Sequence, residues 1–254
     1  MRHASRDYSR TPLNIYWEMT QACALACRHC RAAAMPHAQP GQLTHEESLA
    51  FLHQIPEFGE PLPTLILTGG DPMERPDLLL LIDEARSLGI DVSITPAATP
   101  SLTRDVLITL TEHGVTALGL SLDGSTAERH DAIRGIEGTF DRTLDAIRSA
   151  AEIGLPLQVN TLVTAETAVD MPAVYDLLQP LGLTRWSLFF PIAVGRGTVL
   201  EPLSPQDAEE FMRWVYRTSQ EAPFVVSTTE APSFRRVATE IMRADGLTPE
   251  EMRR

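Results

Sequence analysis

Cysteine is scarce in this sequence, and its few copies are confined to one place. The 254 residues contain three cysteines, all within the stretch CALACRHC between Cys23 and Cys30. No cysteine elsewhere is left to pair with them, and three on so short a loop cannot build the disulfide framework of a small secreted domain. All three thiols are therefore free to bind one centre.

Basic runs and long apolar runs are also missing. The formal net charge is -13, and no stretch is rich in lysine or arginine. Nucleic acid is not an expected partner, because its binding needs cations that neutralise phosphates. No apolar run approaches the roughly 18 residues of a membrane span, and the N-terminus lacks the apolar core of a signal peptide. Together with unpaired cysteines, these absences favour a cytoplasmic protein that does not enter membranes.

The spacing CxxxCxxC indicates a metal centre and leaves its kind open. Cys23, Cys27 and Cys30 can hold a [4Fe–4S] cluster whose fourth iron stays open to a small molecule. Zinc is an alternative, but it needs a fourth ligand, and His29 is poorly placed because it adjoins Cys30. The three could also be buried structural thiols, since free cysteine packs as a small hydrophobe.

Short apolar segments alternate with amphipathic ones along the chain. Segments such as TLILT predict strands, and the TxxE capping box of Thr44 and Glu47 predicts a helix start. This alternation predicts βα units and a parallel sheet covered by helices. The expected strands are residues 13–20, 64–68, 90–95, 115–122, 157–164 and 185–190, and the expected helices are 48–58, 76–87, 102–112, 126–133, 140–153, 170–181 and 205–220.

Polar residues and glycines gather where the expected strands end. Asp71, Ser121 and Asn160 are examples, and a flexible turn, GRG at residues 195–197, follows the sixth strand. Barrel enzymes place their chemistry at the C-terminal ends of the strands. The pattern therefore favours a barrel over an open, doubly wound sheet.

Three motifs in this order resemble the radical S-adenosylmethionine (SAM) superfamily. They are CxxxCxxC after the first expected strand, GGDP at residues 69–72, and SLDG at 121–124 followed by HDAIRG at 130–135. The last is similar to the branch that matures peptides and cofactors, which includes pyrroloquinoline quinone maturases, sulfatase-activating enzymes and haem-pathway proteins. The resemblance covers residues 13–197 and implies an α/β fold, a partial (βα)6 TIM-like barrel with parallel strands and a helical C-terminal tail.

The resemblance also implies which residues bind the cofactors. Cys23, Cys27 and Cys30 would hold a [4Fe–4S] cluster whose open iron takes the amino and carboxylate groups of SAM. Asp71 stands where the family usually has the longer glutamate. The implied SAM contacts are His29 near the adenine, Gly69, Gly70 and Asp71 at the methionine amino group, Ser121 and Arg134 at the carboxylate and nearby hydroxyls, Asn160 at the ribose, and Asp123 as a contact or a turn residue.

The implied activity is reductive cleavage of SAM to a 5′-deoxyadenosyl radical, which removes hydrogen from a peptide or a small cofactor precursor. This step needs no acid–base residue, so none is assigned as catalytic. A flavodoxin or ferredoxin is the expected reductant. Two alternatives stay open: an iron–sulfur electron carrier or scaffold, and a catalytically incomplete fragment of a longer maturase.

The C-terminal part departs most from this branch. No cysteine follows Cys30, so the cysteine-rich extension that binds auxiliary clusters in many members is expected to be absent. The expected organisation is an arm over residues 1–12, a barrel over 13–200 and a truncated helical segment over 201–254. Thr248 and Glu251 have capping-box spacing, with Pro249 at the first helical position, and predict one more helix start.

Overall fold

A seven-stranded parallel sheet forms the centre of the protein. The computed structural model describes residues 6–248 and 250–253. The strands lie in the sheet in chain order, and each pairs in parallel with its sequence neighbours. They are β1 Asn14–Glu18, β2 Thr64–Thr68, β3 Val92–Ile94, β4 Val115–Ser121, β5 Leu157–Leu162, β6 Arg185–Phe189 and β7 Val225–Thr229.

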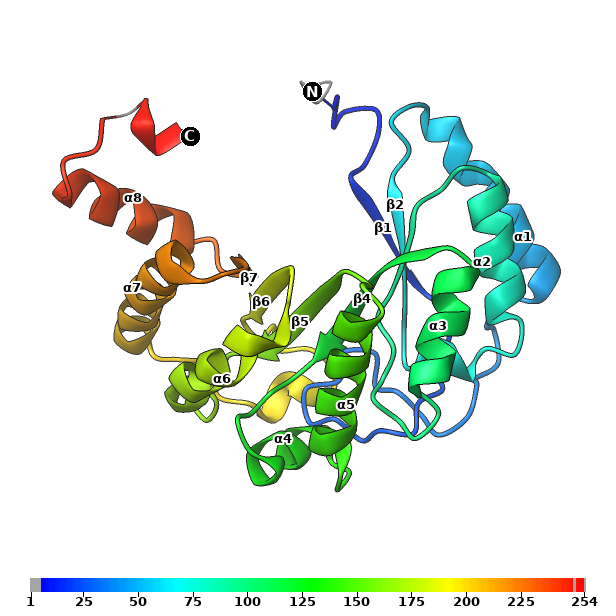
Figure 1. The fold of residues 1–254 in the computed structure, drawn as a ribbon, viewed down its shortest axis with the longest axis horizontal. Coiled ribbons are helices and arrows are strands. Elements are labelled where there is room, and N and C mark those ends of the chain that lie inside the picture. Colours follow the sequence, from blue (N-terminus) through cyan, green and yellow to red (C-terminus); the bar gives the residue numbers. More distant parts are fainter. Residues whose placement is uncertain (1–5, 249, 254) are drawn as a thin grey trace.

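Helices join successive strands and cover the outer face of the curved sheet, so that the whole forms a half-barrel (Figure 1). The α-helices are α1 His45–Gln54, α2 Leu78–Ser87, α3 Arg104–Glu112, α4 Ala127–Arg134, α5 Thr139–Glu152, α6 Met171–Leu178, α7 Pro205–Glu221 and α8 Phe234–Ala244. The 3-10 helices are η1 Ile55–Phe58, η2 Pro72–Glu74, η3 Ala168–Asp170, η4 Gln179–Leu181, η5 Gly195–Val199 and η6 Glu251–Arg253. Within the described ranges, no helix has the length and apolar character to cross a bilayer.

Local signals in the sequence account for the elements. The capping box before α1 is formed: Thr44 Oγ1 accepts from the Glu47 backbone N–H at 3.2 Å, and Glu47 Oε2 accepts from the Thr44 N–H at 2.9 Å. These bonds satisfy N–H groups that the first helical turn leaves free. In β2, Leu65 and Leu67 are buried beneath the helices while their neighbours face inward. A continuous core between sheet and helices results.

The expected βα alternation is confirmed, with one strand more than predicted. Each of the six predicted strands overlaps an observed one, whereas β7 and α8 lie in residues 201–254, where only helix was expected. Four of the five residues of VVSTT are β-branched and favour a strand, but the segment is short, lacks a continuous apolar run and is only half-buried. Pairing with all five residues of β6 makes it a strand.

The capping box predicted near the C-terminus is also formed, but it begins a short turn. Thr248 and Glu251 exchange bonds through Glu251 Oε2 and Thr248 Oγ1, and the 3-10 helix η6 follows. The predicted role of Pro249 falls outside the described residues.

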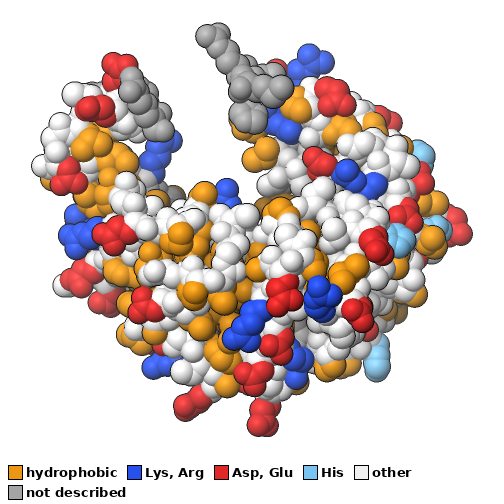
Figure 2. All heavy atoms as spheres, in the orientation of Figure 1, with side chains coloured by type: hydrophobic (Ala, Val, Ile, Leu, Met, Phe, Trp, Pro, Cys, Tyr) orange, Lys and Arg blue, Asp and Glu red, His pale blue; other side chains and the backbone are white. Residues whose placement is uncertain are grey.

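The inner face of the half-barrel is polar between β4 and β7. Strand register places Ser121, Asn160, Ser187 and Ser227 in one row across four strands. The Oγ atoms of Ser187 and Ser227 are 2.9 Å apart. A deep hollow opens between α8 and the β1–β2 side of the molecule (Figure 2). A polar ligand can therefore reach the inner face from this side.

Candidate functional site

The three cysteines converge in the loop that follows β1. Two backbone bonds close this loop: Cys23 N–H to Met35 O and Met35 N–H to Gln21 O, both 2.8 Å. Cys23 and Cys27 are buried with Leu25 and Ala34 in a small cluster separate from the main core, and Cys30 packs against it. The loop thus directs all three thiols to one place.

Each cysteine sulfur accepts a hydrogen bond from a different donor. The Leu25 N–H donates to Cys23 Sγ and the Ala34 N–H to Cys30 Sγ, both at 3.3 Å. Arg134 Nη1 donates to Cys27 Sγ at 3.7 Å. Donors and a guanidinium aimed at sulfur stabilise the thiolate form that ligates metal.

Burial, with smaller contributions from the nearby charges of Asp71, Cys27 and Cys30, raises the pKa of the Cys23 thiol to about 11. This mutual repulsion reflects how closely the acidic groups approach one another. A bound cation would relieve it, because a coordinated thiol is held deprotonated. The donor set therefore fits a metal centre made from three thiolates.

The arrangement fits an iron–sulfur cluster better than a single ion. Within residues 6–248 and 250–253, no three His, Cys, Asp or Glu side chains are placed to hold one metal ion. A [4Fe–4S] cluster does not require this, because each cysteine binds a separate iron. His29, the fourth ligand in the zinc alternative, lies instead on a neighbouring cavity, with its buried Nδ1 atom unpartnered.

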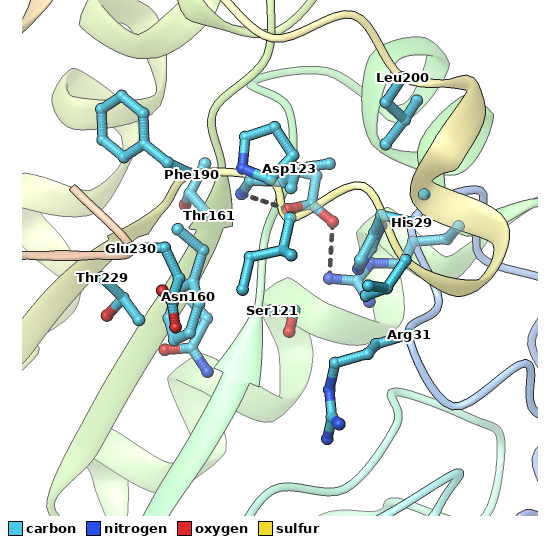
Figure 3. A pocket seen from close by; sticks show the side chains of 17 residues that line it. His29, Arg31, Ser121, Asp123, Asn160, Thr161, Phe190, Leu200, Thr229 and Glu230 are labelled. Carbon is cyan, nitrogen blue, oxygen red and sulfur yellow. Dashed lines mark hydrogen bonds and ion pairs between the residues drawn. The ribbon is translucent and has the colours of Figure 1, made fainter.

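A cavity of about 310 Å³ lies beside the cysteine loop, at the C-terminal ends of β4 to β7. Its size falls within the roughly 300–1,000 Å³ of small-ligand sites. In Figure 3, Asn160, Thr229 and Glu230 gather on one side, His29 and Arg31 on the other, and Ser121 and Asp123 lie between them. The structure thus brings together five of the expected SAM contacts: His29, Ser121, Asp123, Arg134 and Asn160.

A buried ion pair connects the cavity to the cysteine loop. Asp123 Oδ2 and Arg134 Nη2 are 2.6 Å apart, and both side chains are at least nine-tenths buried. The buried Nε atom of Arg134 has no hydrogen-bond partner among the described residues and could donate to a ligand. Burial is the strongest single influence on Asp123 and opposes its ionisation. The Arg134 guanidinium, the imidazoles of His29 and His130 and the Leu162 N–H together outweigh burial and hold the pKa of that carboxyl below its usual value.

The HDAIRG motif builds this ion pair from the end of α4. The backbone N–H of Asp123 donates to Nδ1 of His130 at 3.0 Å, and burial lowers the pKa of that imidazole to about 4, which keeps Nδ1 an acceptor. Gly135 has φ +73°, and a Cβ there would lie 2.7 Å from Ala26 O. Arg134 was expected to hold the SAM carboxylate; in the structure its charge is already paired with Asp123, so it also positions the cavity and the loop.

The GGDP motif lies behind the cysteine loop and does not line the cavity. The backbone N–H groups of Gly70 and Asp71 donate to Thr20 O and Ala22 O, both at 2.7 Å. The glycines therefore allow the chain to approach the loop backbone. Asp71 is fully buried with Oδ2 unpartnered, and burial raises its pKa to about 6. The predicted contact of Gly69, Gly70 and Asp71 with the SAM amino group stays a prediction.

Alanine at position 70 is expected to disrupt the cysteine loop. Its Cβ would lie 2.3 Å from Ala22 O, so the two segments must separate, which costs about 1–3 kcal/mol or more of unfolding free energy. Urea denaturation measures the loss. Gly197→Ala is the matched control, since its Cβ would meet nothing closer than 3.6 Å; equal stability of both variants would contradict this packing role.

Several residues of the site had no signal in the sequence. An apolar wall of Phe189, Phe190, Ile192, Val194 and Leu200 comes from β6 and the segment after it. Glu230 lies at the end of the unexpected β7 and has a left-handed backbone, with φ +59°. Arg196, within the turn expected to be flexible, contacts the cysteine loop. The one available signal for Arg196 was its place between two glycines, Gly195 and Gly197, at the end of a predicted strand.

Comparison with known proteins gives a family match over most of the chain. The model of the radical SAM superfamily matches residues 17–187. The chain is 32% identical over 239 residues to an AdoMet-dependent heme synthase of Methanosarcina barkeri, covering 94% of this chain and 68% of that protein. It is 34% identical over 235 residues to an enzyme of the same name from Oleidesulfovibrio alaskensis, covering 92% and 60%.

The fold also has a close match among solved structures. Streptococcus suis SuiB bound to its precursor peptide SuiA superimposes with a TM-score of 0.75 at 19% identity, covering 92% of this chain and 52% of SuiB. The chain therefore spans about three-fifths to two-thirds of the heme synthases that it matches and about half of SuiB.

Proposed function

Because this chain belongs to the radical SAM superfamily, we propose that it binds a [4Fe–4S] cluster through Cys23, Cys27 and Cys30 and cleaves SAM reductively. The observation that carries this proposal is the convergence of two buried thiols and one partly buried thiol beside a cavity with unpartnered polar atoms. When bound there, the cluster would supply the electron for reductive cleavage of SAM, and SAM would supply the group that takes hydrogen from the substrate.

The residues of the cavity would hold SAM and exclude water. Ser121 and Asn160 offer a hydroxyl and an amide from the strand ends. Burial lowers the pKa of His29 to about 4, so its ring is neutral and can lie against an uncharged group such as a purine. The apolar wall after β6 keeps other hydrogen donors away from the reacting atoms.

A tetrapyrrole precursor of a haem-type cofactor is the substrate class that we propose. The support is the identity of 32% and 34% with two heme synthases over more than nine-tenths of the chain. Such a substrate is larger than the cavity and would extend from it along the polar inner face, where the partly exposed Ser227 offers a hydroxyl. The reductant stays an expected flavodoxin or ferredoxin.

Anaerobic incubation with dithionite and SAM tests the proposal. The reconstituted protein is expected to release 5′-deoxyadenosine, which mass spectrometry detects. A bound cluster without this product would favour the electron-carrier or incomplete-fragment alternatives. Adding an iron porphyrin with propionate groups tests the substrate class: a mass change in the porphyrin supports it, and a change only in an added peptide overturns it.

A further inference from the structure

The turn after β6 packs directly on the cysteine loop, although the two are about 165 residues apart in the chain. A Cβ on Gly195, which has φ +55°, would lie 2.5 Å from Arg31 O and 2.6 Å from Cys30 O. The backbone N–H of Arg196 donates to Cys30 O at 3.0 Å. Glycine at position 195 therefore lets η5 rest on the loop backbone.

The Arg196 side chain bridges two points of the same loop. Its Nε atom donates to Cys27 O at 2.9 Å, and its Nη1 atom donates to Ala34 O at 3.0 Å. Together with the backbone bond to Cys30 O, these contacts connect residues 27, 30 and 34. The planar guanidinium fork sets the distance between the two carbonyls, which a lysine ammonium cannot do.

Arg196 also brings a positive charge that no described carboxylate neutralises. Its Nη2 atom is buried and has no hydrogen-bond partner, and no carboxylate among the described residues forms an ion pair with it. The other guanidinium groups at the loop are paired: that of Arg134 with Asp123, that of Arg28 with Glu166 and that of Arg31 with Glu18. Arg196 as a whole is only partly buried, but a buried donor left without a partner is costly, and a nearby anionic group would satisfy it.

We propose that Arg196 is a positioning residue for the iron–sulfur cluster, which it serves in two ways. It fixes the spacing of Cys27 and Cys30, and its charge stabilises the extra electron of the reduced cluster. The inference rests on the proposed function for the second role only. Reduction adds one electron to the cluster, and a nearby cation raises the reduction potential because it favours the more negative state.

The electrostatic role is tested by redox titration of the reconstituted protein with dithionite as the electron source, followed by EPR. In Arg196→Met the equilibrium constant for one-electron reduction is expected to fall at least tenfold, a shift of about 59 mV to lower potential. Arg196→Lys keeps the charge and is expected to restore the wild-type potential. Arg28→Gln is the matched control, since Arg28 adjoins Cys27 but is half-exposed and paired with Glu166 at 3.0 Å.

The positioning role is tested by hydrogen exchange, with and without iron. Amides of residues 27–34 are expected to exchange at least about tenfold faster in both Arg196 variants and at the wild-type rate in Arg28→Gln. Wild-type exchange and potential in Arg196→Met would overturn the inference. If Arg196→Met does not fold, Arg196→Lys tests the positioning role alone: wild-type exchange of residues 27–34 in that variant would overturn it. A wild-type protein that binds no iron would overturn the proposed function. Hydrogen exchange in the metal-free chain would still test whether Arg196 fixes the cysteine loop.

Discussion

Replacing Cys27 with alanine is expected to remove the cluster and with it all release of 5′-deoxyadenosine. The chain has no other cysteine outside this loop, so no substitute ligand exists for the iron that Cys27 would bind. Anaerobic reconstitution should give about four irons per wild-type chain and fewer than one in the variant. Iron analysis and the visible absorbance of the cluster measure the loss.

The control for this variant is Ala24→Ser, which changes an exposed residue of the same loop. It is expected to keep the wild-type iron content, because position 24 is exposed and a serine there fits without displacing the buried cysteines. Retention of the full iron content by Cys27→Ala, or zinc in place of iron in the wild-type protein, would contradict the assignment of the centre.

Replacing Asp123 with asparagine is expected to lower the free energy of unfolding by about 3–5 kcal/mol, because Arg134 is left as an unpaired buried charge. Asparagine can still accept from the Leu162 N–H, which Asp123 Oδ1 binds at 2.8 Å, so the loss reports chiefly on the charge. Urea denaturation measures it. Asp145→Asn, which breaks an exposed pair with Arg148, should cost no more than about 1 kcal/mol.

The contribution of Asp123 should also depend on pH in one direction. Its pKa is lower in the folded protein than in the unfolded chain, so its charge stabilises the fold above the unfolded value of about 4. This stability is lost as the pH falls through the folded pKa. The difference between wild type and Asp123→Asn should be constant near neutral pH and shrink below about pH 4. A difference that grows on acidification would contradict the ion-pair account.

The elements could be predicted because their signals are local. TLILT is continuous and apolar, and the residues of the Thr44 capping box lie three positions apart. In β7, the β-branched residues of VVSTT favour a strand, but the segment has no continuous apolar run, and its pairing with β6 completes the strand. The end of the half-barrel, and Glu230 with it, was therefore missed.

The site divides in the same way. The cysteines and the strand-end residues Ser121 and Asn160 could be named in advance, since spacing and strand order place them at one end of the sheet. The glycines of GGDP could be recognised as needed, but they make room for Ala22 and Thr20 and do not line the cavity. A glycine in the sequence predicts that another group comes close to the backbone, but it does not identify that group.

By itself, the sequence determined that three thiols meet in one short loop, that βα units build a parallel sheet and that polar residues end its strands. Only the tertiary structure decided that Arg134 pairs with Asp123 and that Arg196 holds the cysteine loop from the far end of the sheet. The physical reason is the distance along the chain over which each interaction acts. Hydrophobic periodicity and capping act over a few residues, whereas the partner of a buried charge depends on how the sheet curves and which loops it brings together.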